Sequence, residues 1–154
     1  MGILRIIASF IAATVIGAIL VTAAQTQVNL QSLIAIGAEI SFGVRLDATL
    51  RDLSAVGPIM GGVLGLGFLI AFATTGMIVR HAASLRLLGY PLAGAAAVIV
   101  ALYAIQWLFA WRLDSIITPF AATRSFAGLA VMALGGAIAG LAYAQMLGQP
   151  TRRA

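Results

Sequence analysis

Long apolar runs alternate with short polar connections along this chain. Four runs are long enough to cross a bilayer as helices, since a span needs about 20 residues. They cover residues 3–24, 58–79, 90–111 and 125–147. The pattern predicts an all-α membrane protein, a four-transmembrane-helix bundle that occupies residues 1–154 as a single domain.

The first run has an alternative interpretation, because an apolar stretch behind an N-terminal arginine is also typical of a signal peptide. Arg5 precedes the run, and a passable cleavage site ends at Ala24. The apolar stretch from Ile6 to Ala24 is, however, longer than the apolar core of about 7–15 residues in a signal peptide. We therefore expect an uncleaved helix.

The outer connection over residues 25–57 is predicted to be ordered, because it is too apolar for a disordered loop. Residues 40–47 alternate apolar and polar positions, which is a strand period. A turn at Gly37 would let residues 28–36 pair with them as a hairpin. The competing interpretation makes residues 30–37 a short helix that lies on the membrane, and both alternatives stay open.

The end of this connection is predicted to be a short amphipathic helix. Leucines recur at helical spacing along one side, at Leu46, Leu50 and Leu53. Asp47 provides an N-cap, and Arg51 follows it by four residues, the spacing of a helical ion pair. Gly57 would end this helix, and Pro58 would start the second span.

Small residues recur at every fourth position on three of the spans. They are Ser9, Ala13 and Gly17 in the first span, Gly61 and Gly65 in the second, and Gly136, Gly140 and Ala144 in the fourth. Because small side chains let two helix backbones approach closely, these stripes predict helix-packing faces. The stripes either close the chain's own bundle or dock a partner or a second copy.

Composition sets the class of protein. The chain is 62% hydrophobic and 8% charged, whereas a soluble domain has about 25% charged residues. The nine basic residues, all arginine, are scattered singly, so no nucleic-acid partner is expected. The absence of cysteine excludes disulfides and thiolate metal sites.

The predicted spans offer little chemistry. Ion and proton pathways usually need ionisable groups at depth, and Gln106 is the deep polar residue that needs a partner from another helix. We expect it to make a packing hydrogen bond. His81 is the only histidine and cannot build a metal site by itself. We therefore expect no catalytic site, metal or cofactor, and hence no enzyme.

The tripeptide Arg-Leu-Asp occurs twice, at residues 45–47 and 112–114. Each copy lies in a connection that leads back into the membrane, over residues 25–57 and 112–124. This placement fits an internal duplication of two helical hairpins or a coincidence in a biased composition.

These outer charges are predicted to pair locally. The expected pairs are Arg45 with Asp47, Arg51 with Asp52, and Arg112 with Asp114, which would hold the two connections together. Arg124 has no acid nearby in its own segment, and it lies where the last span begins. It is therefore predicted to contact an anion, either a phospholipid phosphate or a carboxylate of a partner.

Arginine placement predicts both termini in the cytoplasm of a bacterium, with the chain in the inner membrane. The inner-facing arginines are Arg5, Arg80, Arg86, Arg152 and Arg153. The expected function is that of an accessory or structural subunit, with membrane lipids and other transmembrane subunits, or a second copy, as partners. The alternative is an oligomeric carrier of a small molecule or lipid.

Overall fold

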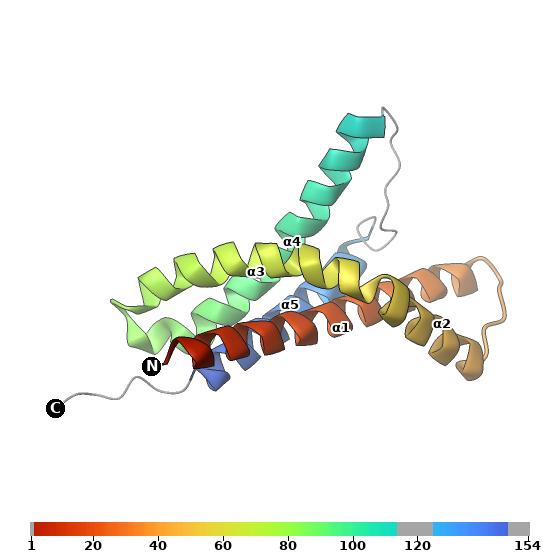
Figure 1. The fold of residues 1–154 in the computed structure, drawn as a ribbon. Helices are drawn as coiled ribbons and strands as arrows, with labels where there is room; N and C mark the ends of the chain where they lie inside the picture. The colour runs from red at the N-terminus through yellow and green to blue at the C-terminus, as the bar shows by residue number, and fades with distance from the viewer. Residues whose placement is uncertain (1, 114–124, 148–154) are drawn as a thin grey trace.

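The structure is a computed structural model that describes residues 2–113 and 125–147. These residues form α1 (Ile3–Ala35), α2 (Phe42–Ala55), α3 (Gly57–Val79), the 3-10 helix η1 (Ala83–Leu85), α4 (Arg86–Leu113) and α5 (Phe126–Met146) (Figure 1). Helices α1, α3, α4 and α5 are long and apolar enough to cross a membrane. The all-helical class and the four spans are therefore confirmed for the described part of the chain.

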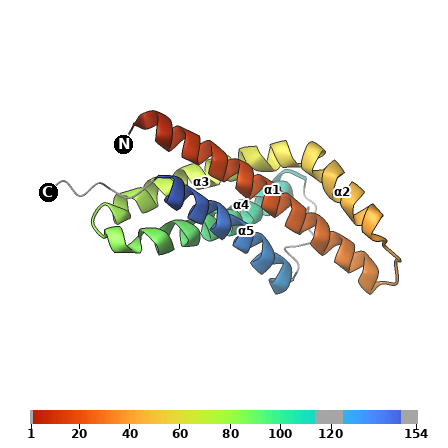
Figure 2. The ribbon, with the colours of Figure 1, turned by 90° about the horizontal axis from the view of Figure 1, so that it is seen from below.

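The four long helices form a ring in which each one packs against two others. Helix α1 packs against α3 and α5, and α4 packs against the same two helices (Figures 1 and 2). Aromatic side chains fill the space between the four helices. Phe72 stacks on Phe68 with ring centres 5.0 Å apart and on Tyr143 at 4.6 Å, and Tyr90 meets both Phe72 and Tyr143 edge to face.

Helix α1 is longer than predicted, because residues 25–35 continue the first span instead of starting a loop. Glutamine and leucine are good helix formers, and several polar side chains of this segment meet α2. The prediction that the chain leaves the helix near residue 24 was therefore wrong. Polar composition marked the membrane boundary and not the end of the helix.

The turn predicted at Gly37 ends α1. Gly37 has a φ of 95°, a left-handed conformation that glycine adopts without strain. Its N–H donates to the Ile34 carbonyl at 2.9 Å, and the N–H of Ala38 donates to the Leu33 carbonyl at 3.1 Å. This pair of bonds is the Schellman motif, a common helix C-terminus.

The hairpin alternative is wrong, since residues 42–55 form α2 and the described residues contain no strand. The Ser41 hydroxyl caps the helix by accepting from the N–H of Val44 at 3.4 Å. The predicted amphipathic helix is present, but it begins at Phe42 rather than at the expected cap, Asp47. An alternation of eight residues is too short to outweigh leucines at helical spacing.

Helices α2 and α3 are separated only by Val56, whose backbone is itself helical. Its N–H donates to the Asp52 carbonyl at 2.8 Å, and its carbonyl accepts from the N–H of Met60 at 2.9 Å. Pro58 lacks an N–H and bends the helix at this point. The predicted break at residues 57–58 is thus a bend within nearly continuous helix.

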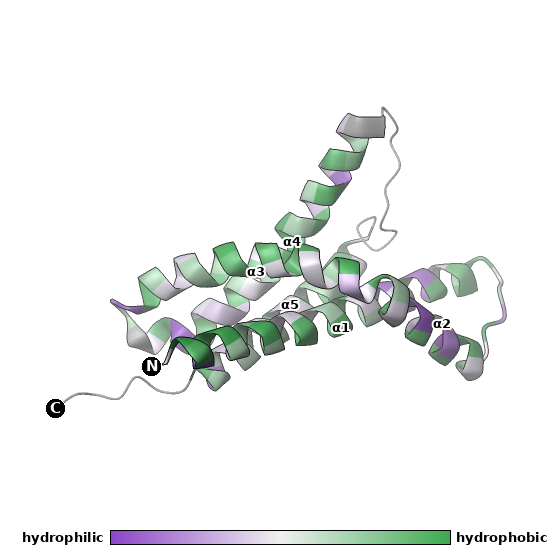
Figure 3. Ribbon diagram, in the orientation of Figure 1, coloured by the Kyte–Doolittle hydropathy of each residue, from purple (hydrophilic) through white to green (hydrophobic). Residues whose placement is uncertain are grey.

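Polar side chains gather at one end of the molecule. Figure 3 shows hydrophilic residues on α2 and on the adjoining end of α1, whereas the long helices are largely apolar along the bundle. This polar end contains the end of α1 and the beginning of α3. Both helices therefore reach the boundary of the apolar bundle on the same side.

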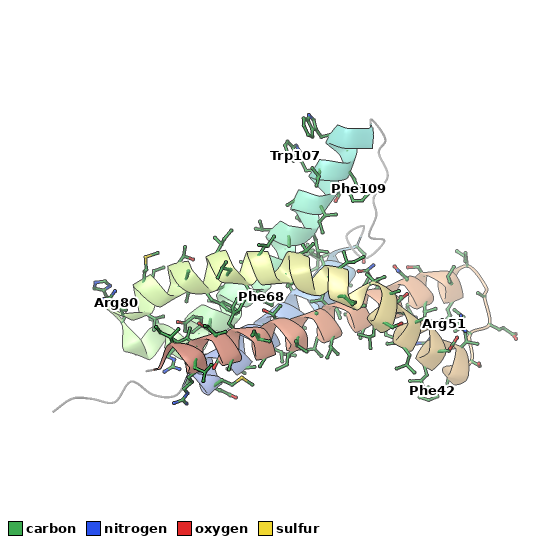
Figure 4. All side chains as sticks on the ribbon, viewed as in Figure 1. Phe42, Arg51, Phe68, Arg80, Trp107 and Phe109 are labelled. Atoms are coloured by element: carbon green, nitrogen blue, oxygen red, sulfur yellow. The ribbon has the colours of Figure 1, made fainter. Side chains whose placement is uncertain are left out.

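The last part of α4 leaves the bundle. Residues 103–113, which we call the α4 arm, project away from α3 (Figure 1). Trp107 and Phe109 lie on this arm (Figure 4). The described residues of α3 and α4 approach closely at Gly67, where an added Cβ would lie 3.5 Å from the Ala97 carbonyl oxygen, and the two helices separate beyond that point.

Candidate functional site

The closest helix contact in the described chain joins α4 and α5. A Cβ added at Gly136 would overlap the Gly94 carbonyl, with the carbonyl carbon at 2.9 Å. A Cβ added at Gly140 would overlap the Tyr90 carbonyl, with the carbonyl carbon at 2.7 Å. The stripe predicted on the fourth span therefore lies against the backbone of the chain's own α4.

The stripe predicted on the first span also faces the interior. Ser9 and Ala13 are buried, and a Cβ on Gly17 would lie 2.7 Å from the ring of Phe68 on α3 and 3.2 Å from Ala139 on α5. Hence α1 fits between two helices where its side chains are smallest. The stripe was expected either to close the chain's own bundle or to dock a partner. Its contacts in the structure are with helices of the same chain.

The stripe on the second span lies against α1. A Cβ at Gly61 would lie 3.5 Å from the Cβ of Ala18, and one at Gly65 would lie 3.4 Å from Cγ2 of Thr14. These are ordinary van der Waals distances, so this crossing is looser than the one between α4 and α5. All three stripes thus contact other helices of the same chain.

A cluster of polar side chains connects α1 to α2, and we call it the polar junction: Thr26, Gln27, Arg45, Thr49 and Asp52. The Thr26 hydroxyl donates to Oδ2 of Asp52 at 2.6 Å. The Gln27 amide donates to the Thr49 hydroxyl at 2.9 Å, and its oxygen accepts from Arg45 at 3.4 Å. Thr26 is only 3% exposed, whereas its partners on α2 are half-buried, so the junction is a partly buried link between a span and α2.

Sequence reasoning missed the polar junction, although it singled out Arg45 and Asp47 as an expected pair. Asp47 pairs with Arg51 at 2.8 Å across one helical turn, and both side chains are well exposed. The predicted pairs Arg45–Asp47 and Arg51–Asp52 are therefore not the ones formed. The helical spacing of Arg45, Thr49 and Asp52 was the signal that would have placed them on one face.

The structure does not describe the side chains that would make the other predicted outer contacts. Arg112 belongs to α4 by its backbone, and Asp114 and Arg124 lie outside the described residues. The predicted pair Arg112–Asp114 and the anion contact of Arg124 stay predictions.

Two arginines close the opposite end of the bundle. The Arg5 guanidinium donates to the Met146 carbonyl at 2.9 Å, and Arg86 donates to the Ala144 carbonyl. The last carbonyls of a helix lack partners within the helix and carry its negative dipole end, so cations are favourable there. Two of the five arginines that sequence reasoning assigned to one side of the membrane, Arg5 and Arg86, thus bond the end of α5.

Gln106 sits at the beginning of the α4 arm. Its Oε1 is buried and has no hydrogen-bond partner among the described residues, where a packing hydrogen bond was expected. Trp107 and Trp111 stack nearby with ring centres 6.3 Å apart and are about two-thirds exposed. Stacked, exposed tryptophans are typical of the interface between hydrocarbon and head groups.

An apolar groove of about 450 Å³ opens between α3 and the outer part of α4. Small residues form much of its walls, and they include Gly67, Ala71, Ala97, Ala101 and Ala104. Leu108 of the α4 arm also lines it. We call this feature the α3–α4 groove, and in a membrane its lining would face hydrocarbon.

A second apolar groove of about 550 Å³ lies between α1 and α3, under the bend at Pro58. Thr14 lines it, and the buried hydroxyl of Thr14 has no hydrogen-bond partner in the described part of the chain.

His81, on the far side of the molecule, bonds the Met77 carbonyl through Nδ1. The described residues hold no cluster of three or more His, Cys, Asp or Glu side chains that could bind a metal.

The chain was compared with protein-family models, curated proteins and solved structures, and it matches none of them.

Proposed function

We propose that this chain is a small, non-catalytic integral membrane protein that serves as a structural subunit by packing against a partner transmembrane helix. The observation that carries the proposal is the α3–α4 groove, bounded by an α4 arm that leaves its own bundle. Four apolar helices are compatible with a multi-pass membrane protein. The groove gives this apolar surface a hollow against which a helix of another chain can pack.

Packing physics explains why a groove of this kind favours a helix. In a bilayer, lipid tails are as apolar as the helices, so association depends on close packing of backbones. Gly67 and Ala71 on α3, with Ala101 and Ala104 on α4, give both walls small residues at helical spacing. Such walls let a third backbone approach closely and gain dispersion contacts that lipid chains match poorly.

The experiment fills the groove without touching the core. Ala104 is exposed and lines the groove, so Ala104→Trp should block it and reduce the mass of the assembly purified in mild detergent. Ala127→Trp is the control, because Ala127 is exposed on α5 and lies outside the groove. Native mass spectrometry that finds the wild type and both variants as single chains would overturn the proposal.

A carrier of a lipid or small apolar molecule is the second candidate. Both grooves fall within the range of about 300–1,000 Å³ of small-molecule sites, and the unpartnered hydroxyl of Thr14 would give the α1–α3 groove one polar contact. The same spectra separate the candidates. A homo-oligomer that retains a small ligand favours the carrier.

We further propose a bacterial inner-membrane location with both ends of the bundle's chain in the cytoplasm. The bond from Arg5 to the Met146 carbonyl puts the beginning of α1 and the end of α5 on one side, together with Arg86. Basic residues favour the cytoplasmic side. A reporter that is active only in the cytoplasm should be active when it is fused after Ala154. A reporter that is active only outside the cytoplasm should be active when it is inserted at Gly37. The reverse pattern would refute this orientation.

A further inference from the structure

Helix α2 carries an apolar face that its own bundle leaves uncovered. Phe42, Leu46 and Leu50 follow one another at four-residue spacing, which places them on one side of the helix. Phe42 is 79% exposed and points away from α1 (Figure 4), and the two leucines are 51% and 57% exposed. We call these three residues the α2 apolar face. An exposed apolar patch with polar residues around it is typical of a surface that binds a protein or a membrane.

We propose that the α2 apolar face rests in the lipid leaflet at the polar end of the bundle, so that α2 is an interfacial helix. Such a helix has an apolar side, which enters the boundary between head groups and acyl chains, and a charged side, which stays in water. This surface is separate from the α3–α4 groove, and the proposal does not depend on the function proposed for that groove.

Continuity with a membrane span identifies lipid as the partner. Leu53 is next on the same side of α2, and it lines the α1–α3 groove together with Val15 and Ile19 of α1. Val15 and Ile19 are about half exposed within a candidate span, so in a membrane they face acyl chains. The apolar surface that lipid covers at Ile19 therefore continues through Leu53 onto the α2 apolar face.

The other sides of α2 are polar, as this placement requires. One side, with Arg45, Thr49 and Asp52, makes the polar junction with α1. Another side carries the Asp47–Arg51 pair, whose side chains are 63% and 79% exposed. Because charges are costly to remove from water, this pair is stable among head groups and not among acyl chains. Helix α2 therefore meets the membrane with its apolar face.

The arrangement of the helices allows this contact. Helix α2 packs obliquely along the polar end of α1 (Figures 1 and 2). Membrane spans are tilted by about 20° on average, and a tilt toward the α2 side brings the α2 apolar face to the head-group layer. Contact between α2 and the leaflet thus favours one direction of tilt for the whole bundle.

The cysteine-free sequence allows a direct test with single spin labels. Leu46→Cys and Leu50→Cys place a label on the α2 apolar face, and Val44→Cys is the matched control. Val44 is 54% exposed on the same helix, and it points to the side opposite Leu46, since two residues turn a helix by about 200°. Each full-length variant is reconstituted into vesicles of phosphatidylcholine and phosphatidylglycerol.

The measurement compares how often each label collides with oxygen, which concentrates among acyl chains, and with a water-soluble nickel chelate. The ratio of oxygen to nickel collisions should be several-fold higher at positions 46 and 50 than at position 44. Equal access of the nickel chelate to all three labels would place the α2 apolar face in water and overturn the proposal.

Two further results would also overturn it. Exclusion of both probes from positions 46 and 50 would mean that protein, and not lipid, covers the α2 apolar face. A ratio at position 44 as high as at position 46 would place both sides of α2 among acyl chains, which contradicts an interfacial helix.

Discussion

Gly140→Leu is expected to destabilise the protein by about 3 kcal/mol or more, the upper end of the range for overpacked interiors. The Cβ alone would overlap the Tyr90 carbonyl and lie 3.0 Å from Cα of Pro91, so backbone and not a movable side chain blocks it. Relief requires α5 to move away from α4. Unfolding by a denaturing detergent, followed by tryptophan fluorescence, measures the loss, and Gly136→Leu should behave alike.

The control for this substitution changes the same residue type in open space. Gly62 on α3 has no atom within 4 Å of an added Cβ, so Gly62→Leu should be neutral or slightly stabilising, because leucine has the better helix propensity. Leu134→Ala, on the exposed face of α5, should also cost little. Equal stability of Gly140→Leu and Gly62→Leu would show that α4 and α5 do not cross at these glycines.

Asp52→Ala is expected to loosen α2 from α1 at a cost of about 1.5–3 kcal/mol, typical of a hydrogen bond to a charged group. The carboxylate accepts from the Thr26 hydroxyl at 2.6 Å. That hydroxyl also lies 3.0 Å from the Thr22 carbonyl, so it keeps an acceptor when Asp52 is removed. The loss should therefore be local, and hydrogen exchange should rise over α2 before the bundle unfolds.

A double-mutant cycle with Thr26→Val isolates this bond, because valine keeps the shape of threonine and removes the hydroxyl. The coupling energy should be about 1–2 kcal/mol, within the range for residues in direct contact. Asp47→Ala serves as the control, because the Asp47–Arg51 pair is exposed and such pairs contribute about 0–1 kcal/mol. Zero coupling between positions 26 and 52 would mean that the Thr26–Asp52 bond does not hold α2.

Hydropathy alone was enough to locate the four spans, since the predicted ends of the second and fourth lie within a residue of the observed ones. Hydropathy could not predict where α1 ends, because a helix continues past the membrane boundary wherever its backbone hydrogen bonds are satisfied. It also left α2 ambiguous. Eight alternating residues fit a strand, whereas the leucines at helical spacing, the cap at Ser41 and the partners on α1 together make the helix the better structure.

The candidate site was harder to predict than the fold. Gly136 and Gly140 were identified from their spacing, but the spacing does not say which helix they meet. The groove depends on where α4 parts from α3, and this angle follows from packing among several helices rather than from any local pattern. Asp52 was expected to neutralise Arg51, whereas it bonds a threonine that is distant in sequence.

The length of α1 has a mechanical consequence. Its 33 residues measure about 50 Å at the usual helical rise, against a hydrocarbon layer of about 30 Å. The protruding end of α1 is joined to α2 at Gly37 and through the hydrogen bonds of the polar junction. Two helices bonded side by side bend less than one, so a push at Gly37 would tilt α1 as a whole instead of bending its protruding end.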